Sequence, residues 1–379
     1  MKRIIMSIIV VLGMLAFFEP IPTYAEGICK DIQDDIVLER ISQEGKNFFF
    51  SHYRELLKAT SSKMNEERIK VCSPFFIYDP IQNNNNEVYY FPIEYNGRIV
   101  TVISLINTTA GWSISSSTEM VDGLNSMNYH KVKEKIFYEG FNEIILETKD
   151  DVVSIERISN VKENSRKSRY KFANQSFNDK KKEILKGLAD TSPVDVKSIQ
   201  VNAKPSSACV GAYTPTFSSN TSTQKICQLY NARGLQGYPI CWAAAVATAV
   251  NYRKGTNYSA TDICDSIGCE YEAQDIATID SALDYYNMNY SIAYNQLSWS
   301  TIKKNIGNKY PVIVVALTSS LNGHAIDVYG YRTISTSDYV IMWNPGTESS
   351  QTIYYNPTGT TFTYNNKVWT WTWSVSMYN

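Results

Sequence analysis

Three residues in the C-terminal half have types and settings that together suit nucleophilic catalysis. Cys241 opens an alanine-rich stretch in "GYPICWAAAVATAV", His324 follows a glycine in "LNGHAIDVYGY", and Asn344 ends an apolar run in "VIMWNPG". A cysteine at a helix start faces unpaired backbone N–H groups and the positive end of the helix dipole, which favour the thiolate. An imidazole nearby would activate the thiol further. The order cysteine, histidine, asparagine therefore predicts a thiol nucleophile, its acid/base and an orienting group.

The third group has two candidates. Asp327 lies three positions after His324 and, on a strand, points to the opposite face. Asn344 ends the next predicted strand, twenty residues after His324 (344 − 324), where antiparallel pairing brings it beside the imidazole and lets Trp343 shield the contact. We therefore prefer Asn344. Gln236, five residues before Cys241, is the candidate side-chain donor to an oxyanion, together with the backbone N–H of Cys241.

The elements that must position these residues follow from periodicity. A helix is predicted from Cys241 to about Lys254, capped by Gly255, with further helices over 273–286 and 299–306. Strands are predicted in "YPVIVVAL", "HAIDVYGY", "YVIMWNP", "TIYYNP" and "KVWTWTWSVSM". In the last, Trp369, Trp371 and Trp373 alternate with threonines, which places all three rings on one face, more simply a packed sheet face than a carbohydrate platform. Helices before strands indicate an α+β class.

The upstream region reads as a separate unit. Residues 1–25 have the basic start, apolar run and small-residue end of a cleaved export signal. Helical periodicity over residues 35–59 is followed by an Asn96-Gly97 hairpin signal and by further strand-like segments up to about residue 158. The basic stretch over residues 161–187 is interpreted as an exposed connector, and the main boundary is placed between about 190 and 215.

Charge and cysteine content exclude other classes. Residues 205–379 carry nine basic and ten acidic side chains with no basic stripe, which argues against nucleic-acid binding. A single histidine and the absence of C-x2-C in this half argue against a metal site. Seven cysteines allow three bridges and one unpaired thiol. We expect Cys264 with Cys269, Cys209 with Cys227 and Cys29 with Cys72 to pair, which leaves Cys241 as the thiol that reacts.

The residues that carry this chemistry resemble the papain-like cysteine proteases. A glutamine before Cys-Trp at a helix start, then Gly-His-Ala and Trp-Asn-Pro, is similar to the exported, staphopain-like bacterial branch, which is made as a preproenzyme. The resemblance implies a two-lobed α+β peptidase domain, a helical lobe plus an antiparallel half-barrel, over residues 201–379. It assigns Cys241 as nucleophile, His324 as acid/base, Asn344 as orienter and Gln236 as oxyanion donor, and it implies that residues 26–200 form an α+β propeptide that inhibits the enzyme.

The sequence departs from the plant enzymes of this family. Tyr238-Pro239-Ile240 replaces the familiar residues before the nucleophile, and His324 follows Cys241 by 83 residues (324 − 241), short of the papain spacing of about 130 to 150. The expected protein is a secreted, monomeric cysteine endopeptidase that cleaves polypeptides without a cofactor or stable membrane association. The alternatives are a cell-wall amidase or transglutaminase of related fold, although the Asp-Cys-Ser expected around an amidase nucleophile is absent, and an exported binding module without turnover.

Overall fold

A computed structural model of the chain describes most of both halves. The described residues are 36–60, 64–80, 88–127, 129, 134–140, 143–157, 172–190, 240–346 and 349–378. The predicted export signal, Gln236, and the cysteines Cys29, Cys209 and Cys227 lie outside these ranges. Most of the boundary region from about 190 to 215 does so too.

The upstream half begins with helices and continues mainly in strands. Its elements are α2 (Ile36–Arg40), α3 (Gln43–Thr60), η2 (Glu66–Arg68), β1 (Ile69–Val71), β2 (Val88–Tyr95), β3 (Arg98–Thr108), β4 (Gly111–Ser117), α4 (Val121–Ser126), β5 (Ile136–Glu139), β6 (Glu143–Glu147), β7 (Val152–Arg157) and α6 (Phe177–Asp190). The predicted hairpin is confirmed: Asn96 and Gly97 take φ values of 52° and 80° between β2 and β3, the left-handed region that a tight hairpin turn requires. The strands β5, β6 and β7 form a small separate sheet.

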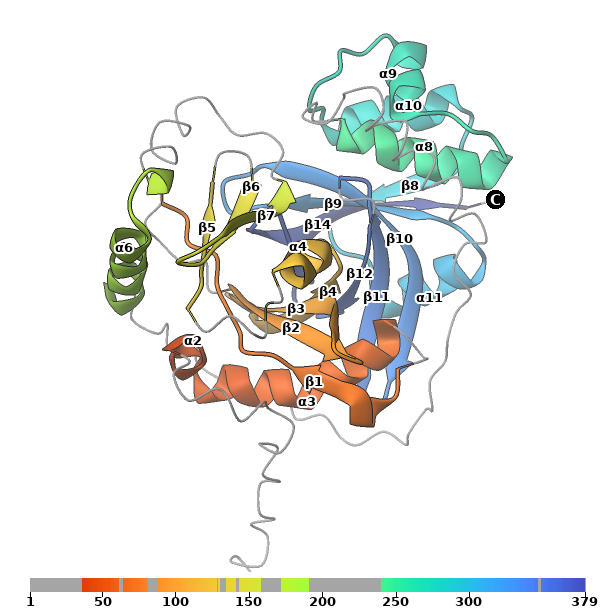
Figure 1. Cartoon of the computed structure of the whole chain (residues 1–379). Helices are drawn as coiled ribbons and strands as arrows, with labels where there is room; N and C mark the ends of the chain where they lie inside the picture. Colours follow the sequence, from red (N-terminus) through yellow and green to blue (C-terminus); the bar gives the residue numbers. More distant parts are fainter. Residues whose placement is uncertain are drawn as a thin grey trace, which may run out of the picture.

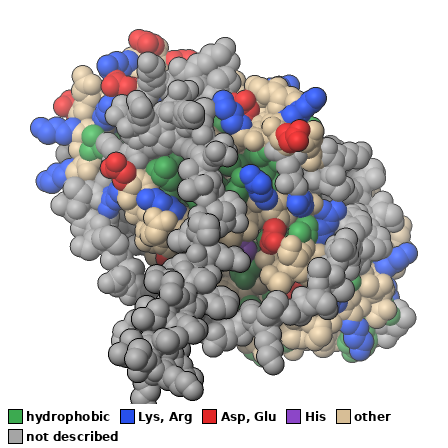
Figure 2. Space-filling view, turned by 90° about the horizontal axis from the view of Figure 1, so that it is seen from below, with side chains coloured by type: hydrophobic (Ala, Val, Ile, Leu, Met, Phe, Trp, Pro, Cys, Tyr) green, Lys and Arg blue, Asp and Glu red, His purple; other side chains and the backbone are tan. Residues whose placement is uncertain are grey.

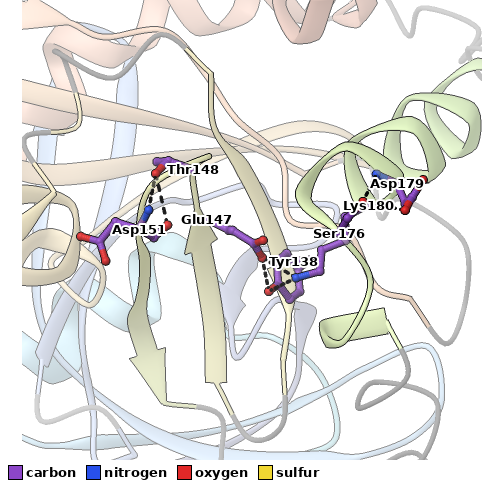
Figure 3. A network of polar contacts seen from close by, with 7 residues as sticks. All are labelled: Tyr138, Glu147, Thr148, Asp151, Ser176, Asp179 and Lys180. Atoms are coloured by element: carbon purple, nitrogen blue, oxygen red, sulfur yellow. Dashed lines mark hydrogen bonds and ion pairs between the residues drawn. The ribbon is translucent and has the colours of Figure 1, made fainter.

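The predicted exposed connector is partly wrong, because its second half contains α6. Lys180 on this helix is buried, and its Nζ lies 2.6 Å from Glu147 Oε2 and 3.2 Å from the Tyr138 hydroxyl. Figure 3 shows the lysine reaching from α6 to the neighbouring strands β5 and β6. A basic sequence did not prevent burial here, because one lysine of the run has a buried carboxylate partner.

The downstream half places helices before strands, as the sequence predicted. Its elements are α8 (Cys241–Lys254), α9 (Ala260–Ile267), α10 (Ile276–Tyr285), β8 (Tyr290–Ala293), α11 (Trp299–Gly307), β9 (Val312–Leu317), β10 (Gly323–Ile334), β11 (Ser337–Asn344), β12 (Ser349–Tyr354), β13 (Thr361–Tyr364) and β14 (Lys367–Met377). Gly255 ends α8 with φ 65° and donates its N–H to Asn251 O at 2.8 Å. The sequence analysis missed α9, although Ser259 and Asp262 form a capping box at its start.

One antiparallel sheet joins the two halves. Its strand order is β1-β2-β3-β4-β12-β11-β10-β9-β14-β13, with β8 paired to β14. The upstream strand β4 meets the downstream strand β12 through Ser115 opposite Ile353 and Ser116 opposite Thr352. Figure 1 shows α8, α9 and α10 grouped at one end of this sheet and α3 lying across the upstream strands. The class is therefore α+β with a mostly antiparallel sheet, and the upstream strands extend the downstream sheet directly.

The expectation that three tryptophans of β14 share one face is wrong. The register with β9 shifts between Trp371 and Trp373, and this irregularity breaks the alternation. Trp369 and Trp371 belong to the core between α11 and the strands, whereas Trp373 packs against the core under α8. The bulge therefore lets one strand contribute aromatic rings to two cores.

On the face seen from below, the described side chains form no continuous band of one charge (Figure 2). Figure 2 views the molecule from below and shows basic and acidic side chains interspersed over the described part of that face. No helix among the described residues is long and apolar enough to cross a membrane.

Candidate active site

Cys241 is the first residue of α8, and its half-buried side chain faces β10. The preceding residue, Ile240, has no side chain that could cap the helix by a hydrogen bond. The backbone N–H of Ala325, next to His324 on β10, points at Cys241 Sγ over 3.5 Å. The sulfur thus lies between the start of a helix and the start of a strand that carries an imidazole.

The pKa of Cys241 is shifted opposite to the expectation from the helix start. Burial raises the pKa of the thiol, and the backbone N–H groups of Ala325, Trp242 and Cys241 itself lower it only in part. The free energy that the thiolate loses when it is removed from water is larger than the free energy that it gains from these N–H groups. In the intact chain the thiol form is therefore favoured.

His324 and Asn344 are brought together by the pairing of β10 with β11. Asp327 lies opposite Trp343 in this pair, so the next residue, Asn344, comes onto the same face as His324. His324 Nε2 lies 2.9 Å from Asn344 Oδ1, and both side chains are buried. The backbone N–H of Gly346 donates to the same Oδ1 at 2.9 Å. Because that atom accepts from a backbone N–H, it is the amide oxygen, and Nε2 must carry the proton that it receives.

Two aromatic rings cover the imidazole. Tyr364 stacks on His324 with ring centroids 4.4 Å apart and an angle of 19°, and Trp369 lies at 5.3 Å. The expected shield, Trp343, packs instead with Tyr329 and Ile341 on the other side of the sheet, because neighbouring residues of a strand alternate between faces. The sequence analysis thus missed Tyr364 as a site residue.

Gly346 is a second residue that the sequence analysis missed. A Cβ at this position would lie 2.3 Å from the Tyr364 hydroxyl and 3.2 Å from Asn344 Oδ1. Only glycine leaves room for the tyrosine that covers His324. The glycine after "WNP" was the one available signal in the sequence.

Burial also determines the charge of the imidazole. It lowers the pKa of His324 to about 4, and the hydrogen bond to Asn344 raises it only in part. At neutral pH the imidazole is therefore neutral, and the thiol of Cys241, whose pKa is raised, is protonated. Both groups are therefore uncharged in the described structure, and they do not form a thiolate with an imidazolium.

Asp327, the other candidate orienter, does not contact His324. It lies on the opposite face of β10 and is 1% exposed, and neither carboxylate oxygen has a hydrogen-bond partner in the part of the chain that the structure describes. Burial raises the pKa of this carboxyl well above its usual range. The structure therefore places Asn344, and not Asp327, at the imidazole.

The expected bridge between Cys264 and Cys269 is not formed. Both are free thiols. Cys264 points into the core under α8, where burial raises its pKa to about 12, and Cys269 follows the left-handed cap Gly268 with a half-buried side chain. The partners expected for Cys72 and for the remaining cysteines lie outside the described residues, as does Gln236. No group of three His, Cys, Asp or Glu in the described ranges could hold a metal ion.

Residues 226–376 match the family model of the Peptidase_C39 like family. No curated protein matches the chain. The matched range contains Cys241, His324 and Asn344 and the downstream elements from α8 to β14, apart from the last residue of β14. The downstream half is thus similar to a family related to papain-like cysteine peptidases, and the match indicates a cysteine peptidase type of hydrolase.

Proposed function

We propose that the chain is the precursor of a secreted cysteine endopeptidase of the two-lobed, papain-like type, in its staphopain-like branch. Residues 201–379 form the peptidase, and residues 26–200 form a propeptide that keeps it inactive. Cys241 is the nucleophile, His324 the acid/base and Asn344 the orienter, while Gln236 donates to the oxyanion. The substrates are polypeptides, and the mature enzyme acts as a monomer without a cofactor.

A single arrangement carries this proposal. The N–H next to His324 points at Cys241 Sγ, and His324 Nε2 is held by an amide oxygen whose own position is fixed by Gly346. Because Nε2 carries a proton, the other ring nitrogen, Nδ1, has the lone pair and serves as the base. An orienting group that fixes the tautomer in this way is what nucleophilic catalysis by a thiol requires.

The residues support a two-step acyl transfer. His324 Nδ1 takes the thiol proton as Cys241 Sγ forms a bond to the peptide carbonyl carbon, and the N–H groups at the helix start stabilise the negative oxygen. The imidazolium then gives its proton to the leaving amine as the C–N bond breaks, which leaves a thioester. A water molecule, deprotonated by Nδ1, attacks the thioester and releases the acid and the thiol.

Inactivity of the precursor is supported by the charge state of the pair. With the pKa of the thiol raised and that of the imidazole lowered, neither group carries the charge of an activated cysteine enzyme. The upstream strands lie in the same sheet as β10 and β11 and hold the hairpin that carries Tyr364, so their removal changes the surroundings of His324. Hydration of the site after cleavage shifts both pKa values toward the ion pair.

The test compares the intact chain with the chain cleaved by trypsin between the two halves. We expect cleavage to produce casein hydrolysis and selective labelling of Cys241 by an epoxide probe, followed by mass spectrometry of each cysteine. The variant His324→Ala should lose both. Cys269→Ala, at another half-buried thiol, is the matched control and should retain both. If the cleaved protein labels no faster at Cys241 than at Cys269, the enzyme proposal is wrong and the binding-module alternative gains support.

Export and self-processing have their own tests. Protein collected from the culture medium should begin at Glu26, because the predicted signal ends at Ala25. If the Cys241→Ala precursor still loses its upstream half in the absence of other proteases, self-processing does not occur.

A further inference from the structure

The β13–β14 hairpin contacts two parts of the protein, the imidazole of His324 along one side and the upstream half at its tip. On one side Tyr364 and Trp369 cover the imidazole of His324. At its tip, Asn365 and Asn366 take φ values of 50° and 51°, the pair of left-handed residues that a two-residue hairpin turn uses. The tip directly follows Tyr364, the tyrosine that stacks on His324. A contact made at the tip can therefore hold the cover of the active site in place.

The tip is held by buried polar groups of the upstream half. Asn366 Nδ2 donates to Glu139 Oε1 at 3.0 Å, and the Tyr90 hydroxyl donates to Asn366 Oδ1 at 3.1 Å. Ser104 Oγ and Thr363 Oγ1 are 2.8 Å apart. All five side chains are buried. We call these five residues the hairpin contact.

Two neighbouring hydrogen bonds, both from Gln351, extend the hairpin contact toward β12. Gln351 Nε2 donates to Glu119 Oε1 and to Thr363 O, each at 3.0 Å. Between the hairpin and the upstream strands the structure leaves a cavity of only about 10 Å³, which holds one water molecule at most. The hairpin is thus seated tightly, and its partners come from strands far away in the sequence.

These contacts are specific because they are polar and buried. A carboxylate such as Glu139, 4% exposed, is costly to bury unless a donor meets it, and Asn366 is one donor that does. Removing Asn366 would leave the carboxylate short of a partner inside the protein. The upstream half therefore recognises this hairpin by chemistry as well as by shape.

We propose that the hairpin contact is a latch, through which the upstream half holds Tyr364 against His324 and so suppresses the reactivity of Cys241. The inference rests on the proposed roles of Cys241 and His324. It assigns the inhibitory contact to the back of the histidine pocket and not to the thiol itself. Opening the hairpin admits water to the imidazole, which allows it to accept the thiol proton.

The decisive variant is Asn366→Gly in the full chain. Glycine accepts the positive φ and suits the second turn position, so the hairpin itself is preserved while both side-chain bonds are lost. Asn96→Gly is the matched control, because it makes the same change at a turn residue with φ 52°. In the described part of the chain the Asn96 side chain accepts only an exposed contact of 3.5 Å from Arg68. The readout is the rate of alkylation of each cysteine by iodoacetamide at pH 7.

We expect Asn366→Gly to label Cys241 about 10- to 30-fold faster than the wild type, the factor that two lost hydrogen bonds represent. Asn96→Gly should label at the wild-type rate. Tyr90→Phe, which keeps the ring and loses one bond, should give a smaller increase, and combining it with Asn366→Gly should add nothing, because both act on one bond.

Two results would overturn the latch: an unchanged Cys241 rate in folded Asn366→Gly, or an equal increase in Asn96→Gly. Rapid labelling of the buried Cys264 would show that the Asn366→Gly variant has unfolded. In that case the labelling rate of Cys241 in Tyr90→Phe is the test, and an unchanged rate there would overturn the latch. The readout needs no peptide hydrolysis. A failure of the enzyme proposal, seen as slow labelling of Cys241 after cleavage with trypsin, is therefore distinct from a failure of the latch.

Discussion

Two buried polar clusters in this protein differ in charge, because one contains an ion pair and the other contains only neutral groups. Around Glu147, the carboxylate receives the Tyr138 hydroxyl at 2.5 Å and Lys180 Nζ at 2.6 Å, so charge meets charge (Figure 3). Around His324, a neutral imidazole meets a neutral amide, and Cys241, which receives the N–H of the next residue Ala325, is a protonated thiol. The first cluster has its charges paired inside the fold. In the second cluster burial keeps the imidazole and the thiol uncharged, so a change in their surroundings can change their protonation states. Shifted pKa values of this kind are common at functional sites.

The comparison predicts its largest effect at the thiol. Cys241→Ala should lower the rate of casein hydrolysis by the cleaved protein about 10⁵-fold or more, because Cys241 is the proposed nucleophile and its removal would block the proposed acyl transfer. Lys180→Met should leave that rate nearly unchanged, since Lys180 contacts only the upstream cluster in the described bonds. A measurable loss of turnover in Lys180→Met at equal amounts of folded protein would show that the two clusters are not separate in function.

The charged cluster should instead control stability. Lys180→Met leaves Glu147 buried without its cation, which typically costs about 3 to 5 kcal/mol. Lys181→Met, one residue on, removes only an exposed pair with Glu134 at 3.3 Å and should destabilise the chain far less. Urea unfolding of the full chain followed by circular dichroism gives both values. Equal stability of the two variants would contradict a structural role for the buried pair.

The sequence predicted local structure well and long-range pairing poorly. The Asn96-Gly97 turn and the Gly255 cap were predictable because their signals lie within a few residues of each other. The pairing of β4 with β12 was not, since no local pattern specifies a partner more than two hundred residues away. The bulge that turns Trp373 to another core was likewise invisible to a count of alternating residues.

The candidate site was predictable only in part for the same reason. Asn344 could be chosen over Asp327 from strand alternation alone, and the structure brings it to His324. Tyr364 could not be found, because its contact with His324 depends on a hairpin that follows twenty residues after Asn344 and on the absence of a side chain at Gly346. The uncharged state of the pair was also missed, since burial is a property of the fold.

The cover over His324 gives a third prediction. Gly346→Ala places a methyl group against Tyr364 and Asn344, which should cost about 1 to 3 kcal/mol of stability and displace the ring from His324. Cys241 in the intact chain should then be alkylated faster. Gly307→Ala, at the end of α11 where nothing lies within 4 Å of the added carbon, should neither lower the stability nor speed the alkylation of Cys241. Thermal unfolding and alkylation of both variants test this directly. Identical behaviour of the two would contradict the claim that Gly346 leaves room for Tyr364 over His324.

Asp327 gives a smaller effect with a defined dependence on pH. Its pKa in the folded chain is raised by burial, so the stability associated with the protonated carboxyl is lost as the pH rises through that pKa. Asp327→Asn should therefore gain stability relative to wild type at pH 8, within the range of about 1 to 3 kcal/mol for a buried polar group, and less at pH 5. Urea unfolding at the two pH values measures the difference. A gain that is larger at pH 5 would have the wrong sign.

His324 contributes to the same pH range in the opposite direction. Its folded pKa of about 4 lies below the ordinary 6.5, so this group's contribution to stability falls as the pH drops between those values. Comparing Asp327→Asn with wild type at each pH removes this contribution, because both proteins contain His324. The contribution of Asp327 to the pH dependence of stability can thus be separated from that of His324 by comparing these two proteins.

The central claim is that His324 activates Cys241, and the pH dependence of alkylation tests it most directly. In the trypsin-cleaved protein, the rate of Cys241 alkylation should stay high well below the ordinary thiol pKa in the wild type, because the imidazolium stabilises the thiolate. In His324→Ala the rate should fall with decreasing pH as that of an ordinary thiol does. Superimposable pH profiles for the two proteins would contradict the account.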